Sequence, residues 1–285
     1  MNERGTNMKD IKEITEQLEQ GVKEVFTSGR YTEYLDTMSK FYNYSANNCM
    51  LIMMQKPEAT MVASYNHWKN DFNRQVQKGE KAIKILAPIP HKRTKEVTLQ
   101  DGTVESRESQ WLSFRAVPVF DISQTEGDPL PTLVERLNGD VKQYRALLVK
   151  IIECAPVLVH FEDIPGKALG YFSTVENRIV IRPGMGEEQT IKTLLHEVAH
   201  SMLHCDGGEE KDADRETREV QAESVAYTVC KYFGINTDGY SFGYIAGWSG
   251  DKDVKQLTES IEIIRKTART IIDSIIERGE NNENN

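Results

Sequence analysis

The residues of this sequence best suited to chemistry are two histidines and a glutamate in the segment His196-Glu197-Val198-Ala199-His200. The segment lies within a helical pattern of apolar residues, and side chains four apart share one face of a helix. His196 and His200 can therefore bind one metal ion, while Glu197 lies about 100° round the helix, where it can reach a water at the metal. Zinc accepts imidazole and carboxylate ligands, so we expect a zinc site with an open position. The alternative is that both histidines are simply packed or exposed.

A second helical segment downstream offers carboxylates for a third ligand. Glu219 and Glu223, in the segment Arg218-Glu219-Val220-Gln221-Ala222-Glu223, are four residues apart and share a face. This pattern and its distance from His200 resemble the gluzincin metallopeptidases. The resemblance implies that Glu219 is the third zinc ligand and that Glu223 orients a ligand histidine. The reverse assignment of the two acids stays open.

Other zinc-peptidase patterns fit less well. A metzincin would need glycine at position 203 and histidine at position 206, where this chain has Leu203 and Asp206. His204 lies eight residues beyond His196, so its direction has drifted from the face that the two ligands share. We therefore prefer Glu219 to Asp206 or His204 as the third ligand.

A zinc ion at this site predicts peptide hydrolysis. The ion lowers the pKa of its water towards ~7, and Glu197 can accept the proton and later return it to a leaving amine. A nearby hydroxyl would stabilise the oxyanion; the candidates are Tyr171, Tyr227, Tyr232 and Tyr240. The preceding segment 177–181 could offer an exposed strand edge to an extended peptide, or it could be an ordinary core strand.

The segment from Asn66 to Lys95 is basic in a chain whose formal net charge is −9. Taken alone, the net charge argues against a polyanion as partner. In this segment, however, eight lysines and arginines stand against two acids, with aromatic residues among them. Cations along a groove with aromatic faces for stacking are typical of single-stranded nucleic-acid binding. The alternative is a solvated charged face, with Trp68 and Phe72 in the core.

A length of 285 residues suggests two units. The helices and strands that must position the residues above indicate an α+β fold. In the first unit, residues 1–122, helices pack on a small antiparallel sheet. We expect helices at 11–26, 31–42, 45–54 and near Ser64, strands at 82–87, 95–99, 103–109 and 111–120, and a hairpin turn at Asp101-Gly102. The polar segment 123–132 is expected to be a linker.

The second unit, residues 133–276, is expected to be a zincin-like metallopeptidase domain built around the helix that contains His196. We expect helices at 141–153, 215–233 and 254–276, a strand at 157–161 and a hairpin of strands 168–172 and 178–181. Residues 277–285 form a polar tail that is expected to be disordered.

The sequence indicates a cytoplasmic protein. No window approaches the ~18 uninterrupted apolar residues of a membrane helix, and acids run through the N-terminal segment, which is therefore not a secretory signal. We expect no membrane partner, no nucleotide cofactor and reduced cysteines.

Three N-terminal segments resemble the N-terminal domain of ArdC-type antirestriction proteins. They are Tyr44–Asn48, Arg74–Ile83 with Trp68 before it, and Val119–Gly127. In that family this domain binds single-stranded DNA and a zincin-like metallopeptidase domain follows, which is the order seen here. The chain departs from the family at Phe72-Asn73-Arg74, where members often have Leu-Gly-Arg and this chain lacks the glycine.

The resemblance implies a bacterial protein of a plasmid or conjugative element that binds single-stranded DNA and carries a zinc-dependent peptidase site. The residues expected to bind DNA are Tyr44, Asn47, Trp68, Lys69, Arg74, Lys78, Lys81 and Lys84. One alternative is a non-catalytic protein that protects entering single-stranded DNA and whose zinc site is structural or vestigial. Another is a metallopeptidase without a DNA function.

Overall fold

The fold is described by a computed structural model that covers residues 3–98, 104–130, 141–240 and 242–283. Its helices are α1 (Glu3–Thr27), α2 (Tyr31–Lys40), α3 (Ala46–Gln55), α4 (Tyr65–Asp71), α5 (Val141–Cys154), α6 (Glu187–Leu203), α7 (Arg215–Tyr232), α8 (Ile245–Ser249) and α9 (Val254–Glu283). Its strands are β1 (Val62–Ala63), β2 (Arg74–Val76), β3 (Ile83–Thr98), β4 (Val104–Asp121), β5 (Thr125–Gly127), β6 (Leu158–Phe161), β7 (Gly170–Ser173) and β8 (Arg178–Ile181). The predicted turn at Asp101-Gly102 and residues 131–132 of the predicted linker lie outside the described residues.

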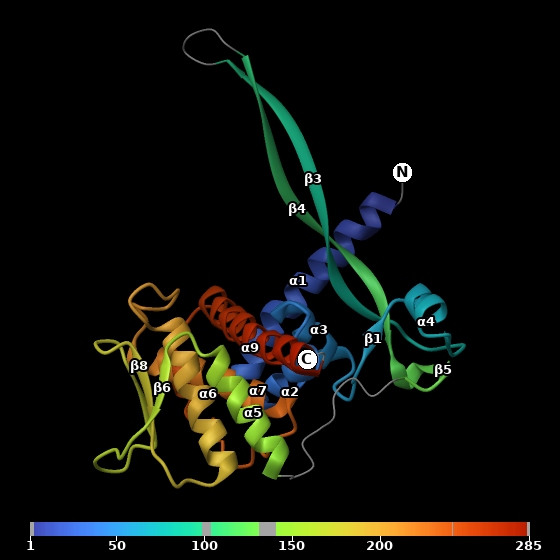
Figure 1. The fold of residues 1–285 in the computed structure, drawn as a ribbon. Coiled ribbons are helices and arrows are strands. Elements are labelled where there is room, and N and C mark those ends of the chain that lie inside the picture. The colour runs from blue at the N-terminus through green and yellow to red at the C-terminus, as the bar shows by residue number, and fades with distance from the viewer. Residues whose placement is uncertain (1–2, 99–103, 131–140, 241, 284–285) are drawn as a thin grey trace.

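The N-terminal part combines helices with a small antiparallel sheet, as the sequence predicts. Ser45 caps α3 and Ser64 caps α4, each by accepting a backbone N–H three residues on at 3.3 Å. Strands β3 and β4 pair antiparallel without a break, and β1 adds to the base of β4. The resulting hairpin is longer than the separate short strands that the sequence suggests, and it projects far from the body of the molecule (Figure 1).

The C-terminal part contains a three-stranded sheet in the order β6-β8-β7, in which β6 is parallel to β8 and β7 is antiparallel to it. Because β8 is the central strand and Ile179, Val180 and Ile181 are buried, the segment 177–181 is a core strand and offers no free edge. The edge strands of this sheet are β6 and β7. Helix α6 packs against both β7 and β8, which places it beside the β7 edge.

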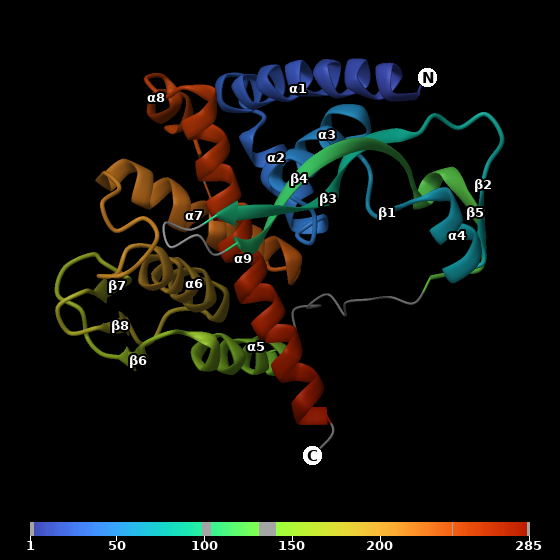
Figure 2. The ribbon, with the colours of Figure 1, turned by 90° about the horizontal axis from the view of Figure 1, so that it is seen from above.

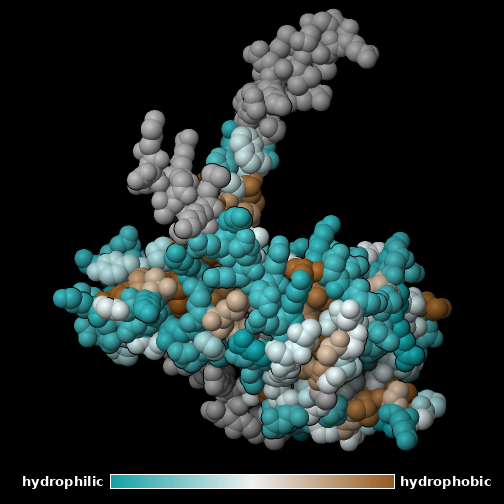
Figure 3. Space-filling view, turned by 180° about the vertical axis from the view of Figure 1, so that it is seen from behind, coloured by the Kyte–Doolittle hydropathy of each residue, from teal (hydrophilic) through white to brown (hydrophobic). Residues whose placement is uncertain are grey.

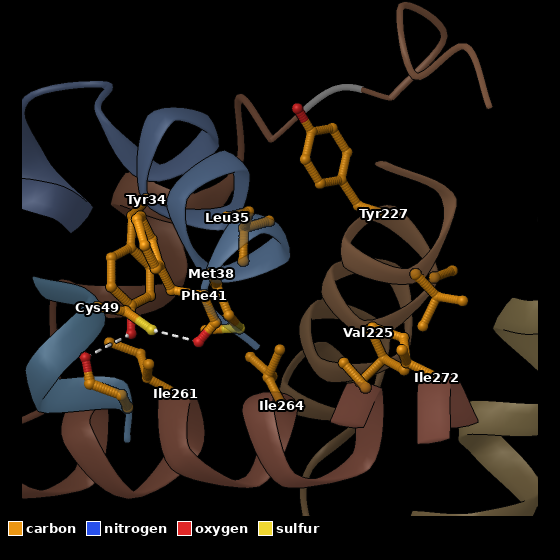
Figure 4. Packing of buried hydrophobic residues seen from close by; sticks show 14 of the residues in the cluster. Tyr34, Leu35, Met38, Phe41, Cys49, Val225, Tyr227, Ile261, Ile264 and Ile272 are labelled. Atoms are coloured by element: carbon orange, nitrogen blue, oxygen red, sulfur yellow. Dashed lines mark hydrogen bonds between the residues drawn. The ribbon is translucent and has the colours of Figure 1, made fainter. Parts of the chain in front are cut away.

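The two parts share one continuous core. Tyr34, Leu35 and Met38 of α2 belong to one apolar cluster with Val225 of α7 and the isoleucines of α9 (Figure 4). Within this core the Tyr31 hydroxyl and Ser224 Oγ lie 2.8 Å apart. Burial of this apolar surface is the main force that holds α7, the helix that carries the two candidate acids, between α2, α6 and α9.

Helix α9 continues to Glu283, beyond the predicted end at 276. Figure 2 shows it running the length of the molecule, past α7 and α5, and it packs against both. Its residues Ile261, Ile264, Ala268 and Ile272 recur at three or four positions and are buried, which gives the helix a continuous apolar face. Across the part of the chain that the structure describes, no helix is both long and apolar enough to cross a membrane.

Candidate metal centre

Helices α6 and α7 bring two histidines and a glutamate together. His196 and His200 lie one turn apart on α6, and their Nε2 atoms are 3.0 Å from each other. Glu219, in the first turns of α7, places one carboxylate oxygen 3.4 Å from Nε2 of His196 and the other 3.8 Å from Nε2 of His200. One ligand atom from each residue lies within 4.8 Å of the other two, close enough for all three to bind one ion.

The chemistry of this donor set suits a divalent metal ion. Burial and the neighbouring His196 and His204 lower the pKa of His200 to about 3, so its imidazole is neutral and has a lone pair to share. For His196, burial favours the neutral ring, but the hydrogen bond to Glu219 and the charge of Glu197 outweigh it and raise the pKa. The contact with His196 in turn lowers the pKa of Glu219, which therefore supplies an ionised oxygen. Two imidazole nitrogens and a carboxylate are the donor types found in three-ligand zinc sites with an open position.

A chain of hydrogen bonds fixes which nitrogen of His200 carries the proton. A carboxylate only accepts, so the contact of 3.1 Å between Glu210 and Gln221 makes the Gln221 amide nitrogen the donor and turns its Oε1 towards His204. His204 Nε2, 3.0 Å from that oxygen, must then donate. Because burial lowers the pKa of His204, the ring is neutral and its Nδ1 accepts. His200 Nδ1, at 2.9 Å, is therefore the donor, which leaves the Nε2 lone pair for a metal.

Glu197 lies beside this cluster but outside it. Its side chain is only 7% exposed, and the backbone N–H of Phe172 in β7 donates a hydrogen bond to its carboxylate. Burial raises the pKa of Glu197 to about 6, despite the opposing charge of His196. A carboxylate with a raised pKa is a better proton acceptor than an ordinary glutamate.

Two cavities, of about 410 and 400 Å³, open on either side of the cluster. Both are lined by Gly170, His196, Glu197 and Glu219, so an extended ligand that passes from one to the other must cross these side chains. Gly170 allows β7 to lie against α6, because a Cβ there would stand 2.7 Å from a methyl group of Thr193. We refer to the two cavities and the residues that they share as the groove.

Glu223 lies in the larger cavity, one turn beyond Glu219, and is outside the three-residue cluster. Its carboxylate accepts a short hydrogen bond from the hydroxyl of Tyr244, a residue that the sequence analysis did not single out. Burial raises the pKa of Glu223, while this hydrogen bond opposes the shift. The hydrogen bond links α7 to the segment before α8, and the charge of Glu223 also acts on the pKa of His196.

The four tyrosines considered as oxyanion donors lie in different places. Tyr240 lines the larger cavity and Tyr171 lines the smaller one. The Tyr227 hydroxyl instead donates to Asp36 at 2.6 Å. The ring of Tyr232 packs edge-on against Tyr42. Only Tyr171 and Tyr240 lie where a ligand in the groove could meet them.

The aromatic and polar residues expected to bind DNA, which are Trp68, Tyr44 and Asn47, do not lie together on one exposed surface. Trp68 is 0% exposed and its indole N–H donates to the Phe120 carbonyl at 2.8 Å, so it is a core residue. The Tyr44 hydroxyl donates to the Val62 carbonyl at 3.0 Å. Asn47 lines a cavity between α1 and the start of α9.

The basic residues of this set divide into one structural arginine and four surface lysines. The guanidinium of Arg74 donates to the hydroxyl and the carbonyl of Thr125, at 2.8 and 3.0 Å, and so joins β2 to β5. Lys69, Lys78, Lys81 and Lys84 are exposed on α4, on the loop before β3 and at the start of β3. The glycine that the family has before Arg74 is replaced by Asn73, which adopts the left-handed conformation itself, with φ of 51°.

Two family models match the chain. Residues 8–120 match ArdcN, the N-terminal domain of anti-restriction factor ArdC. Residues 152–238 match Peptidase_M78, an IrrE N-terminal-like domain, and this range includes the residues of the candidate metal centre.

One curated relative and two solved structures are similar to this chain. An uncharacterized protein of Bacillus anthracis is 28% identical over 308 residues, which cover 93% of this chain and 51% of that protein, so the chain spans about half the length of this curated relative. The metal-free crystal structure of antirestriction ArdC protein from the R388 plasmid superposes with a TM-score of 0.52 at 19% identity, over 85% of this chain and 86% of that one. The Mn(II)-bound structure of the same protein gives a TM-score of 0.49 at 17% identity, over 82% and 84%. The first of these structures shows that the two chains share a fold.

Proposed function

Since the chain belongs to the ArdC-type family, we propose that it is an antirestriction-like protein of a mobile element that binds single-stranded DNA and hydrolyses peptide bonds with zinc. In this proposal residues 1–122 bind DNA and residues 133–276 hold the metal through His196, His200 and Glu219. The segment 123–132 links them, although its first part contains β5, which pairs with β2 of the N-terminal part. The protein would act in the bacterial cytoplasm, where incoming DNA is exposed to restriction.

The position of Glu197 is the observation that carries the peptidase proposal. A structural zinc site needs ligands only, and Glu197 is not one of the three clustered ligands. It is nevertheless buried at the junction of two cavities, with a raised pKa and a backbone hydrogen bond that fixes its carboxylate. This arrangement favours a catalytic base over a structural or vestigial zinc site.

In the proposed reaction the chain positions a peptide and moves one proton. Bound zinc would supply Lewis-acid activation of the scissile carbonyl and of the attacking water. The carboxylate of Glu197 accepts the proton of that water and passes it to the nitrogen of the leaving amine. Strand β7 is an edge strand of its sheet and lines both cavities, so its backbone groups, apart from the Phe172 N–H that binds Glu197, can pair with an extended peptide and hold it across Glu197. Tyr171 or Tyr240 can donate a hydrogen bond to the oxyanion.

The DNA-binding proposal depends on the basic N-terminal surface. Lys69, Lys78, Lys81 and Lys84 are exposed in a chain that is acidic as a whole. Exposed cations concentrated in one segment can neutralise phosphates even where the net charge is negative. Trp68 and Arg74 support this surface from within through their hydrogen bonds to Phe120 and Thr125.

Two assays on the full chain test the proposal. Cleavage of an unfolded protein substrate should require metal, disappear after chelation and return when zinc is restored. Binding of a single-stranded oligonucleotide should exceed binding of the matching duplex and should fall steeply as salt rises. Metal-independent cleavage would contradict the first half of the proposal, and negligible DNA binding at low salt would contradict the second.

A further inference from the structure

The β3–β4 hairpin stands clear of the rest of the protein. We define the arm as residues 83–92 and 110–120, the paired lengths of the two strands nearest the body, whose register runs from Ile83 opposite Val119 to Lys92 opposite Gln110. At its base Ile83, Ile85 and Val119 are buried in the core. Farther out, the arm rises from the body with hydrophilic and hydrophobic side chains at its surface (Figure 3). The arm is therefore anchored in the core at its base and exposed to solvent in its outer part.

Large apolar side chains are exposed on the arm. Trp111 is 48% exposed, Leu112 is 61% exposed and Phe114 is 48% exposed. Successive residues of a strand point to opposite faces, so Trp111 lies on one face and Leu112 and Phe114 on the other. A group of exposed large apolar side chains is typical of a surface that meets a partner.

The face with Trp111 is organised for stacking. The ring of His91, directly opposite in the register, lies 5.1 Å from the Trp111 ring at an interplanar angle of 13°, so the two rings are stacked. Nε2 of His91 is 2.7 Å from the hydroxyl of Ser113 on the same face. These contacts hold the two rings parallel and fix the Trp111 ring as a platform.

The charged residues within these bounds of the arm are all basic. Residues 83–92 and 110–120 contain Lys84, Lys92 and Arg115 and no aspartate or glutamate, although the whole chain carries a net charge of −9. Arg115 is exposed and lies four residues beyond Trp111, on the same face of the strand. A cation at this spacing from an aromatic platform is complementary to a nucleic-acid strand, whose phosphates alternate with flat bases.

We propose that the Trp111 face of the arm is a binding surface for single-stranded nucleic acid, on which a base stacks against Trp111 and a phosphate pairs with Arg115. This inference rests on the proposed DNA-binding function and locates it on a specific surface. Unpaired bases are favoured over a duplex because only a base outside a helix offers its flat face to a ring. The aromatic residue expected from sequence to stack, Trp68, is buried, whereas Trp111 is exposed.

The test compares substitutions on the two faces in the full chain. With a fluorescently labelled single-stranded oligonucleotide, Trp111→Ala and Arg115→Ala should each weaken binding about tenfold. Arg115→Ala should also reduce the magnitude of the slope of log affinity against log salt by about 0.7. Leu112→Ser, at the neighbouring and more exposed position on the opposite face, is the matched control and should bind as the wild type does. All three side chains are exposed, so the melting temperature should be unchanged.

Tryptophan fluorescence gives a second readout. Trp68 and Trp248 are buried, so quenching by the unlabelled oligonucleotide should come from Trp111 and vanish in Trp111→Phe, which keeps a ring and most of the affinity. If the wild type binds the single strand but Trp111→Ala and Arg115→Ala bind equally well, the arm proposal is overturned and DNA binding stands. If the wild type binds no oligonucleotide at low salt, the proposed DNA function itself fails. Concentration-dependent dimers that Leu112→Ser abolishes, with unchanged oligonucleotide affinity in the Trp111 variants, would identify the arm as a self-association element instead.

Discussion

His204 Nε2 lies 3.0 Å from Gln221 Oε1, in the buried space between α6 and α7. Neither residue is among the clustered ligands. Together they connect the candidate ligand His200 to the carboxylate of Glu210, on the loop between the helices. The direction of each hydrogen bond follows from Glu210, which can only accept, and it leads to a proton on Nδ1 of His200. The helix-helix contact that brings Glu219 to the histidines therefore also fixes the tautomer that metal binding requires.

Replacement of His204 by phenylalanine should weaken metal binding without removing a ligand. Without an acceptor at His204, the proton of His200 can move to Nε2, where it competes with the metal. We expect affinity for zinc to fall about 10- to 100-fold, as measured by competition with a chelator. Gln221→Leu should act in the same direction. His160→Phe, at a histidine of β6 whose side chain is 41% exposed, serves as the control. Unchanged affinity in a folded His204→Phe protein would rule out this role.

Asp121 makes the stability of the N-terminal part depend on pH. It is 1% exposed, and its carboxylate accepts the backbone N–H groups of Thr60, Met61 and Ser123 at 2.8, 3.1 and 2.9 Å. Although burial favours the neutral acid, these hydrogen bonds outweigh it and lower the pKa of Asp121. Since the folded pKa lies below the unfolded value of about 3.9, the stabilisation is complete above that pH and is lost as the pH falls through the folded pKa.

Asp121→Asn should therefore reduce the free energy of unfolding by about 1–3 kcal/mol at neutral pH. The difference from the wild type should shrink as the pH falls below about 4. Urea titrations at a series of pH values measure both quantities, with the exposed Asp163→Asn as the control. A difference that stays constant down to pH ~3 would show that the charge of Asp121 is not responsible.

Substitutions at Asn73 test whether an asparagine adopts here the backbone conformation that a glycine turn would have. Its φ of 51° lies in the left-handed region, and its side-chain amide donates to Asp128 at 2.6 Å. Asn73→Ala should lower the free energy of unfolding by about 1 kcal/mol, because alanine is strained in this region. Asn73→Gly relieves the strain and should cost less. Thermal melts compare the two variants, and the opposite order of stability would contradict this explanation.

The helices could be predicted from sequence because their signals are local. Ser45 caps its helix as expected, and the apolar spacing on either side of His196 identifies the helix that carries the two histidines. The pairing of His204 with Gln221 could not be predicted, since it depends on how α6 and α7 cross. His204 follows His200 by four residues, and this spacing was the available signal that the two rings are neighbours.

The arm and the edge strand show a second limit of prediction. Pro88 and Pro90 interrupt the sequence pattern of β3, which therefore suggests shorter strands than the continuous pairing that is observed. The segment 177–181 has the composition of either an edge or a core strand, and only its place between β6 and β7 decides for the core. Sheet order is set by long-range pairing, which no local pattern records.

The most direct test of the proposed metal centre is the substitution Glu197→Gln in a chain with a measured metal content. Because Glu197 lies outside the ligand cluster, the variant should bind one zinc ion per chain, as the wild type does. Glutamine cannot accept the proton, so cleavage of an unfolded protein substrate should fall by at least about 10²-fold. Glu219→Gln should instead lose metal affinity. Full cleavage by metal-loaded Glu197→Gln would contradict the assignment of Glu197 as the base and, with it, the proposed mechanism.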